Sequence, residues 1–172
     1  GIQMGLLVKI PLLFDGSRLG FTENSFLQYD IAEKEIGRGC YFLAWPTGHD
    51  YVVGFIGGRF AWDLSKQSED KIVEYALSKL ASLHGSNIRK HFLKGFASDW
   101  ANNPLTMGAY SAVKPGCSGA RELLSEPIAE KLIFAGEATA GNLAGLVNGA
   151  YESGKMAAIR ISNLIKTKIS PL

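Results

Sequence analysis

The sequence has few of the residues that build the commonest catalytic and metal sites. It holds two cysteines, Cys40 and Cys117, and three histidines among 172 residues. The cysteines are far apart and lack the spacing of metal ligands, which leaves a disulfide or two free thiols. Free thiols in a reducing compartment are favoured. His49, His84 and His91 show no cluster with a carboxylate or cysteine at ligand spacing, so we expect no metal site and place His84 at the end of a helix.

Long apolar runs and blocks of like charge are also missing. No apolar run reaches the roughly 18 residues of a membrane span, and no run of about five like charges occurs. The net charge is +2, so we expect neither nucleic acid nor a membrane as a partner. The chain opens GIQMGLLVKIPLLF, without an initiator Met. This predicts a cut end with any targeting segment lost upstream, and the cytoplasm is the favoured compartment.

Three sequence signatures of catalysis or phosphate binding are absent. There is no G-x-G-x-x-G dinucleotide fingerprint, no Walker-type phosphate loop and no G-x-S-x-G nucleophile elbow in the sequence. Cys117 stands in a Pro-Gly loop without an activating base. These absences argue against a self-contained nucleotide site, a serine hydrolase or a cysteine nucleophile.

The hydrophobic content of 47% is that of an ordinary globular protein. Pro11, inside the first of the predicted strands, indicates an edge position or a bulge. Apolar and β-branched runs predict strands at residues 6–14, 40–45, 51–56 and 91–97, with a hairpin around PTGHD between the middle two.

Apolar residues at helical spacing predict a helix over residues 65–83. Ser65 or Ser68 can cap its start, and Gly85 can end it. We expect the four strands to form one sheet with this helix against it. The alternation of strands and helices predicts a mixed α/β or α+β fold.

The stretch FAGEATAGNLAGLVNGAYESG, residues 134–154, holds five of the 20 glycines. The apolar residues 131–135 before it predict a short buried strand, and residues 145–166 predict a helix. Glu137 offers a carboxylate to ligand hydroxyls at the strand end, where ligands bind in open α/β sheets. The free N–H groups and positive dipole end of the helix can stabilise negative charge beside it. The alternative is a strand, turn and helix whose glycines serve packing alone.

Four motifs together resemble the C-terminal part of the flavin-containing amine oxidases, the monoamine and polyamine oxidase family. They are a Gly-x-x-x-Lys strand (residues 5–9), Gly57-Gly58 before a helix, and a Trp, Gly-x-Tyr and Pro-Gly series (residues 100–116). The fourth is FAGEAT followed by NGAYESG (residues 134–154). Their order and spacing fit from about residue 5 to about residue 165.

The resemblance implies FAD as the cofactor. Gly136 and Glu137 would line its ribityl and pyrophosphate region. The helix start at Leu146-Val147 would direct N–H groups at the flavin pyrimidine, where reduced flavin carries negative charge. Trp100 would support the loop beside the site. The dinucleotide-binding N-terminal segment of the family is not in this sequence, so we expect weak or no FAD binding and no activity from this fragment alone.

Lys9 and Tyr110 would serve the reaction, by the same resemblance. Lys9 aligns with the family lysine that holds a water near flavin N5; the sequence pattern alone also fits a strand lysine that reaches solvent. Tyr110 aligns with one tyrosine of the pair that sandwiches the substrate amine, and its alternative is a loop tyrosine packed on the core.

Two positions depart from the family pattern. Leu146 stands where the partner tyrosine falls, which argues against small aromatic amines and leaves polyamines, amino acids or other amines open. Ala109 stands where the monoamine oxidases carry the cysteine that bonds to flavin. We therefore expect non-covalent FAD.

The resemblance predicts that residues 1–120 belong to a substrate-binding domain and residues 121–172 to an FAD-binding domain. The implied reaction oxidises the C–N bond of a small amine to an imine and reduces O2 to H2O2, and the missing N-terminal portion of the same chain is a required partner. Alternatives are an FAD-dependent desaturase or porphyrinogen-type oxidase, and a non-catalytic binding domain derived from this fold.

Overall fold

The chain forms two compact units. The structure is a computed structural model that describes residues 1–27, 31 and 33–169. Leu6–Ala109 form one unit, which we call the sheet unit; Gly1–Gly5 together with Tyr110–Leu172 form the other, which we call the helix unit.

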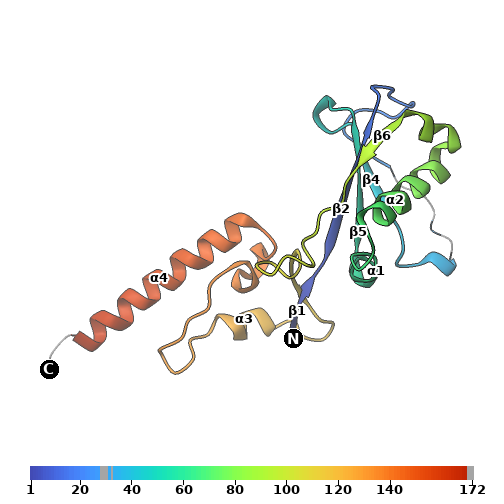
Figure 1. The fold of residues 1–172 in the computed structure, drawn as a ribbon. Coiled ribbons are helices and arrows are strands. Elements are labelled where there is room, and N and C mark those ends of the chain that lie inside the picture. The colour runs from blue at the N-terminus through green and yellow to red at the C-terminus, as the bar shows by residue number, and fades with distance from the viewer. Residues whose placement is uncertain (28–30, 32, 170–172) are drawn as a thin grey trace. The chain divides into compact units, whose positions relative to one another are not determined.

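The sheet unit is built on five antiparallel strands in the order β3-β4-β5-β2-β6 (Figure 1). The four predicted strands and the predicted hairpin, β4–β5, are confirmed. The strands are β2 (Leu7–Phe14), β3 (Ser25–Leu27), β4 (Tyr41–Ala44), β5 (Tyr51–Gly57) and β6 (Phe92–Gly95).

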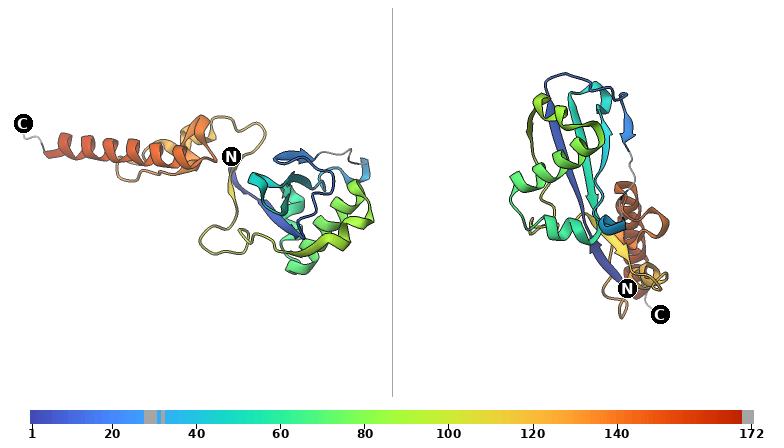
Figure 2. Two further views of the ribbon diagram at one scale, coloured as in Figure 1. Left: turned by 90° about the horizontal axis from the view of Figure 1, so that it is seen from above. Right: turned by 90° about the vertical axis from the view of Figure 1, so that its right-hand side faces the viewer.

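Alternation along β2 and β5 divides the sheet into a buried face and an open face. In β2, alternate residues from Val8 to Phe14 are buried, whereas Lys9 between them is exposed. Because side chains of successive strand residues point to opposite faces, Lys9 lies on the face away from the core. Figure 2 shows the green α2 against the sheet.

The predicted helix is confirmed as α2 (Glu69–His84), with the shorter α1 (Gly58–Leu64) before it. Ser68 is the N-cap residue of α2 and Gly85 its C-cap. The apolar face of α2 packs on the buried face of the sheet, through Ile72, Ala76, Leu77 and Leu80. Single-turn 3₁₀ helices at Glu33–Glu35 and Pro46–Gly48 and a longer one at Ser86–His91 complete the sheet unit.

The prediction for Pro11 is wrong. Its strand, β2, lies between β5 and β6 and so is not at an edge, and the register irregularity falls at Leu13/Phe14 instead. The carbonyl of Pro11 accepts a hydrogen bond from the N–H of Phe96, just past the end of β6. The proline is tolerated because its missing N–H faces a point where the neighbouring strand has already ended.

The helix unit holds a two-stranded ribbon and one long helix. Strand β1 (Ile2–Gly5) pairs antiparallel with β7 (Tyr110–Val113). The short helix α3 (Ala120–Ser125) follows, then the 3₁₀ helices Glu137–Thr139 and Gly141–Leu143. The predicted C-terminal helix is confirmed as α4 (Val147–Ile169), which runs uninterrupted in Figure 1.

The prediction of a buried strand at residues 131–135 is wrong. Only one isolated bridge, between Ile128 and Leu132, occurs here, and Leu132 and Phe134 are exposed. A buried strand needs hydrogen-bonding neighbours on its flanks, and the described residues of the helix unit provide none for this segment.

Burial differs sharply between the units. Every buried apolar side chain of the described residues lies in the sheet unit, between Leu6 and Ile88. No helix within residues 1–27, 31 and 33–169 is long and apolar enough to cross a membrane. Cys40 and Cys117 are both free thiols, and burial raises the pKa of Cys40 to about 12.

Candidate functional site

Glu137 is held by three hydrogen bonds from the helix unit itself. Its Oε1 accepts the backbone N–H of Ser111 at 2.7 Å. Its Oε2 accepts the hydroxyl of Ser111 at 2.9 Å and the backbone N–H of Gly145 at 2.7 Å. Because a carboxylate offers about four acceptor positions, most of them are already used within the protein. Glu137 thus ties strand β7 to the turn that precedes α4.

Arg121 completes this group, and sequence reasoning missed both it and Ser111. One guanidinium nitrogen of Arg121, Nη1, donates to Ser111 Oγ at 2.5 Å and to the carbonyl of Ala138 at 3.0 Å. The other, Nη2, donates to the carbonyl of Ser111 at 3.1 Å. No sequence motif marked these residues, because the contacts join segments 10 to 26 residues apart.

The charge of Glu137 is stabilised by these neighbours. Partial burial acts to raise the pKa of Glu137, but the hydrogen bonds from Ser111 and Gly145 and the nearby Arg121 outweigh it. The pKa therefore lies below its ordinary value, and the carboxylate stays ionised near neutral pH.

The start of α4 is open to solvent. Gly145 has a φ of 79°, a left-handed conformation that favours glycine, and turns the chain into the helix. Leu146 accepts the first hydrogen bond, from the N–H of Ala150. Val147 is 89% exposed and Asn148 is exposed too, whereas Gly149 is buried, so the first two residues of α4 lie at the surface with the positive end of the helix dipole.

The Gly136 turn is fixed against α4 by hydroxyl groups. The backbone N–H of Gly136 donates to Ser153 Oγ at 3.0 Å, and Thr139 Oγ1 lies 2.5 Å from the same oxygen. Gly136 has a φ of 139°, and nothing lies within 4 Å of the position that a Cβ would take. A ligand can therefore approach this backbone closely.

Tyr110 is part of a strand rather than of a packed loop. It stands opposite Gly5 in the β1–β7 ribbon and is 41% exposed. Its neighbour Ser111 is buried and carries the hydrogen bond to Glu137. Since successive strand residues face opposite ways, the Tyr110 ring lies on the face away from the Glu137 group.

Lys9 and Trp100 belong to the sheet unit. Lys9 pairs with Phe55 across β2 and β5, and Phe55 pairs with Tyr41 across β5 and β4. The three side chains therefore form one row on the open face of the sheet. Sequence reasoning missed Phe55 and Tyr41, although strand alternation places them beside Lys9 once the register is known.

Trp100 supports the loop that it begins. Its carbonyl accepts the N–H of Gly108 at 2.8 Å and the hydroxyl of Thr106 at 2.9 Å. The indole itself is exposed. The structure thus places Tyr110, Gly136, Glu137, Leu146 and Val147 in the helix unit, and Lys9 and Trp100 in the sheet unit.

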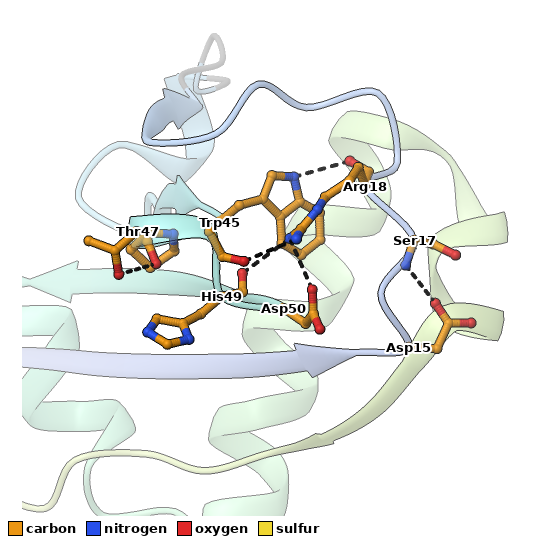
Figure 3. A network of polar contacts seen from close by, with 9 residues as sticks. Asp15, Ser17, Arg18, Trp45, Thr47, His49 and Asp50 are labelled. Carbon is orange, nitrogen blue, oxygen red and sulfur yellow. Dashed lines mark hydrogen bonds and ion pairs between the residues drawn. The ribbon is translucent and has the colours of Figure 1, made fainter.

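A second polar group, drawn in Figure 3, closes one end of the sheet unit. Arg18 donates to the carbonyls of Gly48 and His49, pairs with Asp50 at 3.1 Å, and lies over the ring of Trp45. The Trp45 indole N–H donates back to the carbonyl of Arg18 at 3.1 Å. These contacts fix the loop after β2 to the β4–β5 turn, which is a structural task.

His91 does meet a carboxylate, which corrects the sequence expectation. Its Nδ1 lies 3.0 Å from Asp15 Oδ2 and 3.1 Å from Ser17 Oγ. The hydrogen bonds from His91 and Ser17 lower the pKa of Asp15 to about 2. In a Ser-His-Asp triad the serine and the acid use different ring nitrogens, so this arrangement is not one. His84 is confirmed as the last residue of α2.

Comparison with known proteins identifies the family. Residues 1–162 match the sequence profile of the flavin-containing amine oxidoreductases. The chain belongs to this family. Members of this family are flavin-containing oxidoreductases, so membership implies a flavin cofactor. Within residues 1–27, 31 and 33–169, no three His, Cys, Asp or Glu side chains gather as metal ligands.

The relatives include polyamine oxidases and histone demethylases. Polyamine oxidase 5 of Oryza sativa subsp. japonica is 35% identical over 91% of the chain. Lysine-specific histone demethylase 1 homolog 3 of Arabidopsis thaliana is 30% identical over 96% of the chain, and Polyamine oxidase 2 of Arabidopsis thaliana is 34% identical over 72%. The chain spans 31%, 10% and 26% of the lengths of these three relatives, respectively.

Proposed function

We propose that this chain is the C-terminal portion of an FAD-dependent amine oxidase that converts a C–N bond to an imine and reduces O2 to H2O2. The observation that carries the proposal is the exposed start of α4, held in place by the Glu137 group and set beside the open backbone of Gly136. Within the family, a site of this kind suits a flavin. The chemistry that FAD supplies when bound is acceptance of a hydride equivalent from the carbon next to the substrate nitrogen.

The residues present fit one part of this cofactor. Open space over Gly136 leaves room for the ribityl chain. At Leu146-Val147, the N–H of the exposed Val147 would donate to the pyrimidine oxygen of the ring, whereas the N–H of Leu146 already donates to the carbonyl of Leu143. A preorganised helix end at a place where negative charge develops stabilises that charge without reorganisation. The fingerprint for the adenosine half is absent from the sequence, so we propose that another segment of the same protein holds that half.

Two residues of this chain would act on the substrate side. The exposed ring of Tyr110 would present its face to the substrate amine. The ring would bind the protonated amine as a cation or orient the lone pair of the neutral amine. Lys9 would hold a water near the flavin N5. The apolar ring of Phe55 beside it would exclude further solvent from the lysine's side of the sheet.

The departures from the family pattern restrict the proposal. With Leu146 in place of a second tyrosine, one wall of the amine site is aliphatic. We therefore propose a substrate other than a small aromatic amine. With Ala109 at the attachment position, no thiol is present there to bond to the cofactor, so the FAD would be non-covalent.

Two features of the helix unit argue for a further segment that packs against it. It has no buried apolar side chain among its described residues, and a groove of about 560 Å³ runs along α4 beside Phe134, Leu143 and Met156. Isolated domains bury their apolar faces against a second layer. We propose that this layer is the remainder of the FAD-binding domain, N-terminal in the same protein, and that this chain alone is inactive.

The upstream coding sequence and the native protein test this proposal. We expect a strand followed by G-x-G-x-x-G and an acidic residue about 20 positions on. We also expect that the longest native protein containing this chain binds FAD and releases H2O2 with amines, whereas the 172-residue chain does not. A native reading frame without the fingerprint and a protein without flavin would refute it and favour a binding domain; flavin without amine-dependent peroxide would favour a desaturase.

A further inference from the structure

Arg121 acts on Glu137 through Ser111. The guanidinium makes three hydrogen bonds, two to Ser111 and one to the carbonyl of Ala138, and these bridge α3, β7 and the Glu137 turn. Ser111 and Gly145 donate hydrogen bonds to Glu137, whereas within the described residues Arg121 makes no ion pair with it. Its effect on the carboxylate therefore travels through the Ser111 hydroxyl and through its charge.

The donors and acceptors of this group fix the direction of each hydrogen bond. Arginine has donors only, and an ionised carboxylate has acceptors only. Ser111 Oγ must therefore accept from Arg121 and donate its single proton to Glu137 Oε2. The same Oε2 accepts the N–H of Gly145. Hydrogen bonds in such a chain polarise and strengthen one another.

The last member of the chain sets the start of α4. Gly145 is two residues before Val147, the first residue of the helix, and its backbone hydrogen bond to Glu137 fixes where the helix begins. Tyr110 precedes Ser111 in β7, so the same group also fixes the strand that carries the tyrosine ring.

We propose that Arg121 is a positioning residue, which through Ser111 and Glu137 holds the Gly145 amide and the start of α4 in place for the reaction. This proposal rests on the proposed function in one respect, namely that the start of α4 points at the flavin. The hydrogen-bond chain itself does not, and can be tested without flavin or amine.

The test compares Arg121→Met with Arg121→Lys in the longest native protein that contains this chain. Before flavin is added, hydrogen–deuterium exchange is measured on the peptide spanning residues 142–150. We expect exchange about tenfold faster in Arg121→Met. The loss of charged hydrogen bonds should lower the local stability by an amount that corresponds to a factor of about ten in the opening equilibrium. The lysine variant keeps one charged donor and should recover part of the protection. Arg160→Met is the matched control, because Arg160 pairs with Glu126 and contacts none of this group.

A double-mutant cycle tests whether Arg121 acts through the hydroxyl. Ser111→Ala removes the hydroxyl and keeps the backbone donor to Glu137, and Ser125→Ala is its control, because that hydroxyl donates to Glu122 alone. We expect the losses from Arg121→Met and Ser111→Ala to be strongly non-additive. If Arg121→Met does not fold, Ser111→Ala should still deprotect residues 142–150 and Ser125→Ala should not. Additive losses, or equal effects of variants and controls, would overturn the proposal.

Steady-state kinetics of the flavin-loaded protein distinguish a positioning arginine from a merely structural one. Positive helix-end charge matters most once negative charge has developed, so Arg121→Met should lower kcat severalfold with KM nearly unchanged. A rise in KM with constant kcat would overturn the positioning role. If none of the proteins oxidises an amine, the proposed function fails, while the exchange result still decides the role of Arg121 in the chain of hydrogen bonds.

Discussion

Two glycines of α4 should respond in opposite ways to the same substitution. A Cβ added at Gly149 would clash with the carbonyl oxygen of Leu143 and would lie 2.8 Å from its carbonyl carbon. Both are backbone atoms, so the turn before the helix must move. A Cβ added at Gly154 meets nothing within 4 Å. The two positions therefore share a helix and differ in the space available.

The magnitudes follow from this difference. Alanine is favoured over glycine inside a helix by about 1 kcal/mol, and overpacking against rigid atoms costs about 1–3 kcal/mol. Gly154→Ala should thus stabilise α4 by about 0.5–1 kcal/mol. At Gly149 the clash is with backbone atoms, so its cost should lie in the upper part of that range, about 2–3 kcal/mol. After the gain in helix propensity of about 1 kcal/mol, Gly149→Ala should destabilise α4 by about 1–2 kcal/mol.

Hydrogen exchange of the α4 amides in the native protein measures both effects locally. We expect exchange roughly tenfold faster in Gly149→Ala and up to about fivefold slower in Gly154→Ala, since 1.4 kcal/mol corresponds to a factor of ten. Slower exchange in both variants would refute the close packing of Leu143 on Gly149. Faster exchange in both would refute the open space at Gly154.

Four further outcomes are expected. Lys9→Met in the flavin-loaded native protein should slow flavin reduction or reoxidation about a hundredfold in rapid-mixing kinetics. The melting temperature should stay nearly unchanged, because the side chain is exposed. Unchanged half-reactions would remove Lys9 from the mechanism. The lowered pKa of Glu137 means that its stabilisation is complete above the ordinary value of 4.5 and is lost as the pH falls through the lowered value; Glu137→Gln should remove this part of the acid sensitivity in unfolding titrations. Burial and the raised pKa of Cys40 predict that iodoacetamide modifies Cys117 in the native chain and leaves Cys40 intact by mass spectrometry. Acid precipitation should release all flavin into solution because Ala109 provides no thiol; a yellow pellet would contradict this.

Local patterns explain which parts of the fold could be predicted. The alternation of residues 6–14 and the single apolar face of α2 depend on neighbours within a few positions, and both were confirmed. Residues 131–135 carry the same apolar signal but form no strand, because strand formation depends on neighbours that the described part of the helix unit does not supply. The surroundings of Pro11 likewise depend on where β6 ends.

In the candidate site, too, features set by local spacing could be predicted and those set by distant residues could not. The Gly-Glu turn and the helix after it have a recognisable spacing, and the structure places Gly136, Glu137, Leu146 and Val147 in one unit. The direction of the Glu137 carboxylate could not be predicted, because its donors come from residues 26 positions earlier and 8 positions later. The pairing of Asp15 with His91, 76 positions apart, was missed for the same reason.

The most direct test of the account is anaerobic mixing of amines with the longest native protein that contains this chain, loaded with FAD. A panel of polyamines, amino acids, methylated lysine peptides and small aromatic amines is added while the visible flavin absorption is followed. The account predicts that at least one amine other than the small aromatic ones bleaches the flavin, and that admission of O2 restores the colour with one H2O2 per imine formed. A protein that binds FAD stoichiometrically but is bleached by none of these amines would contradict it.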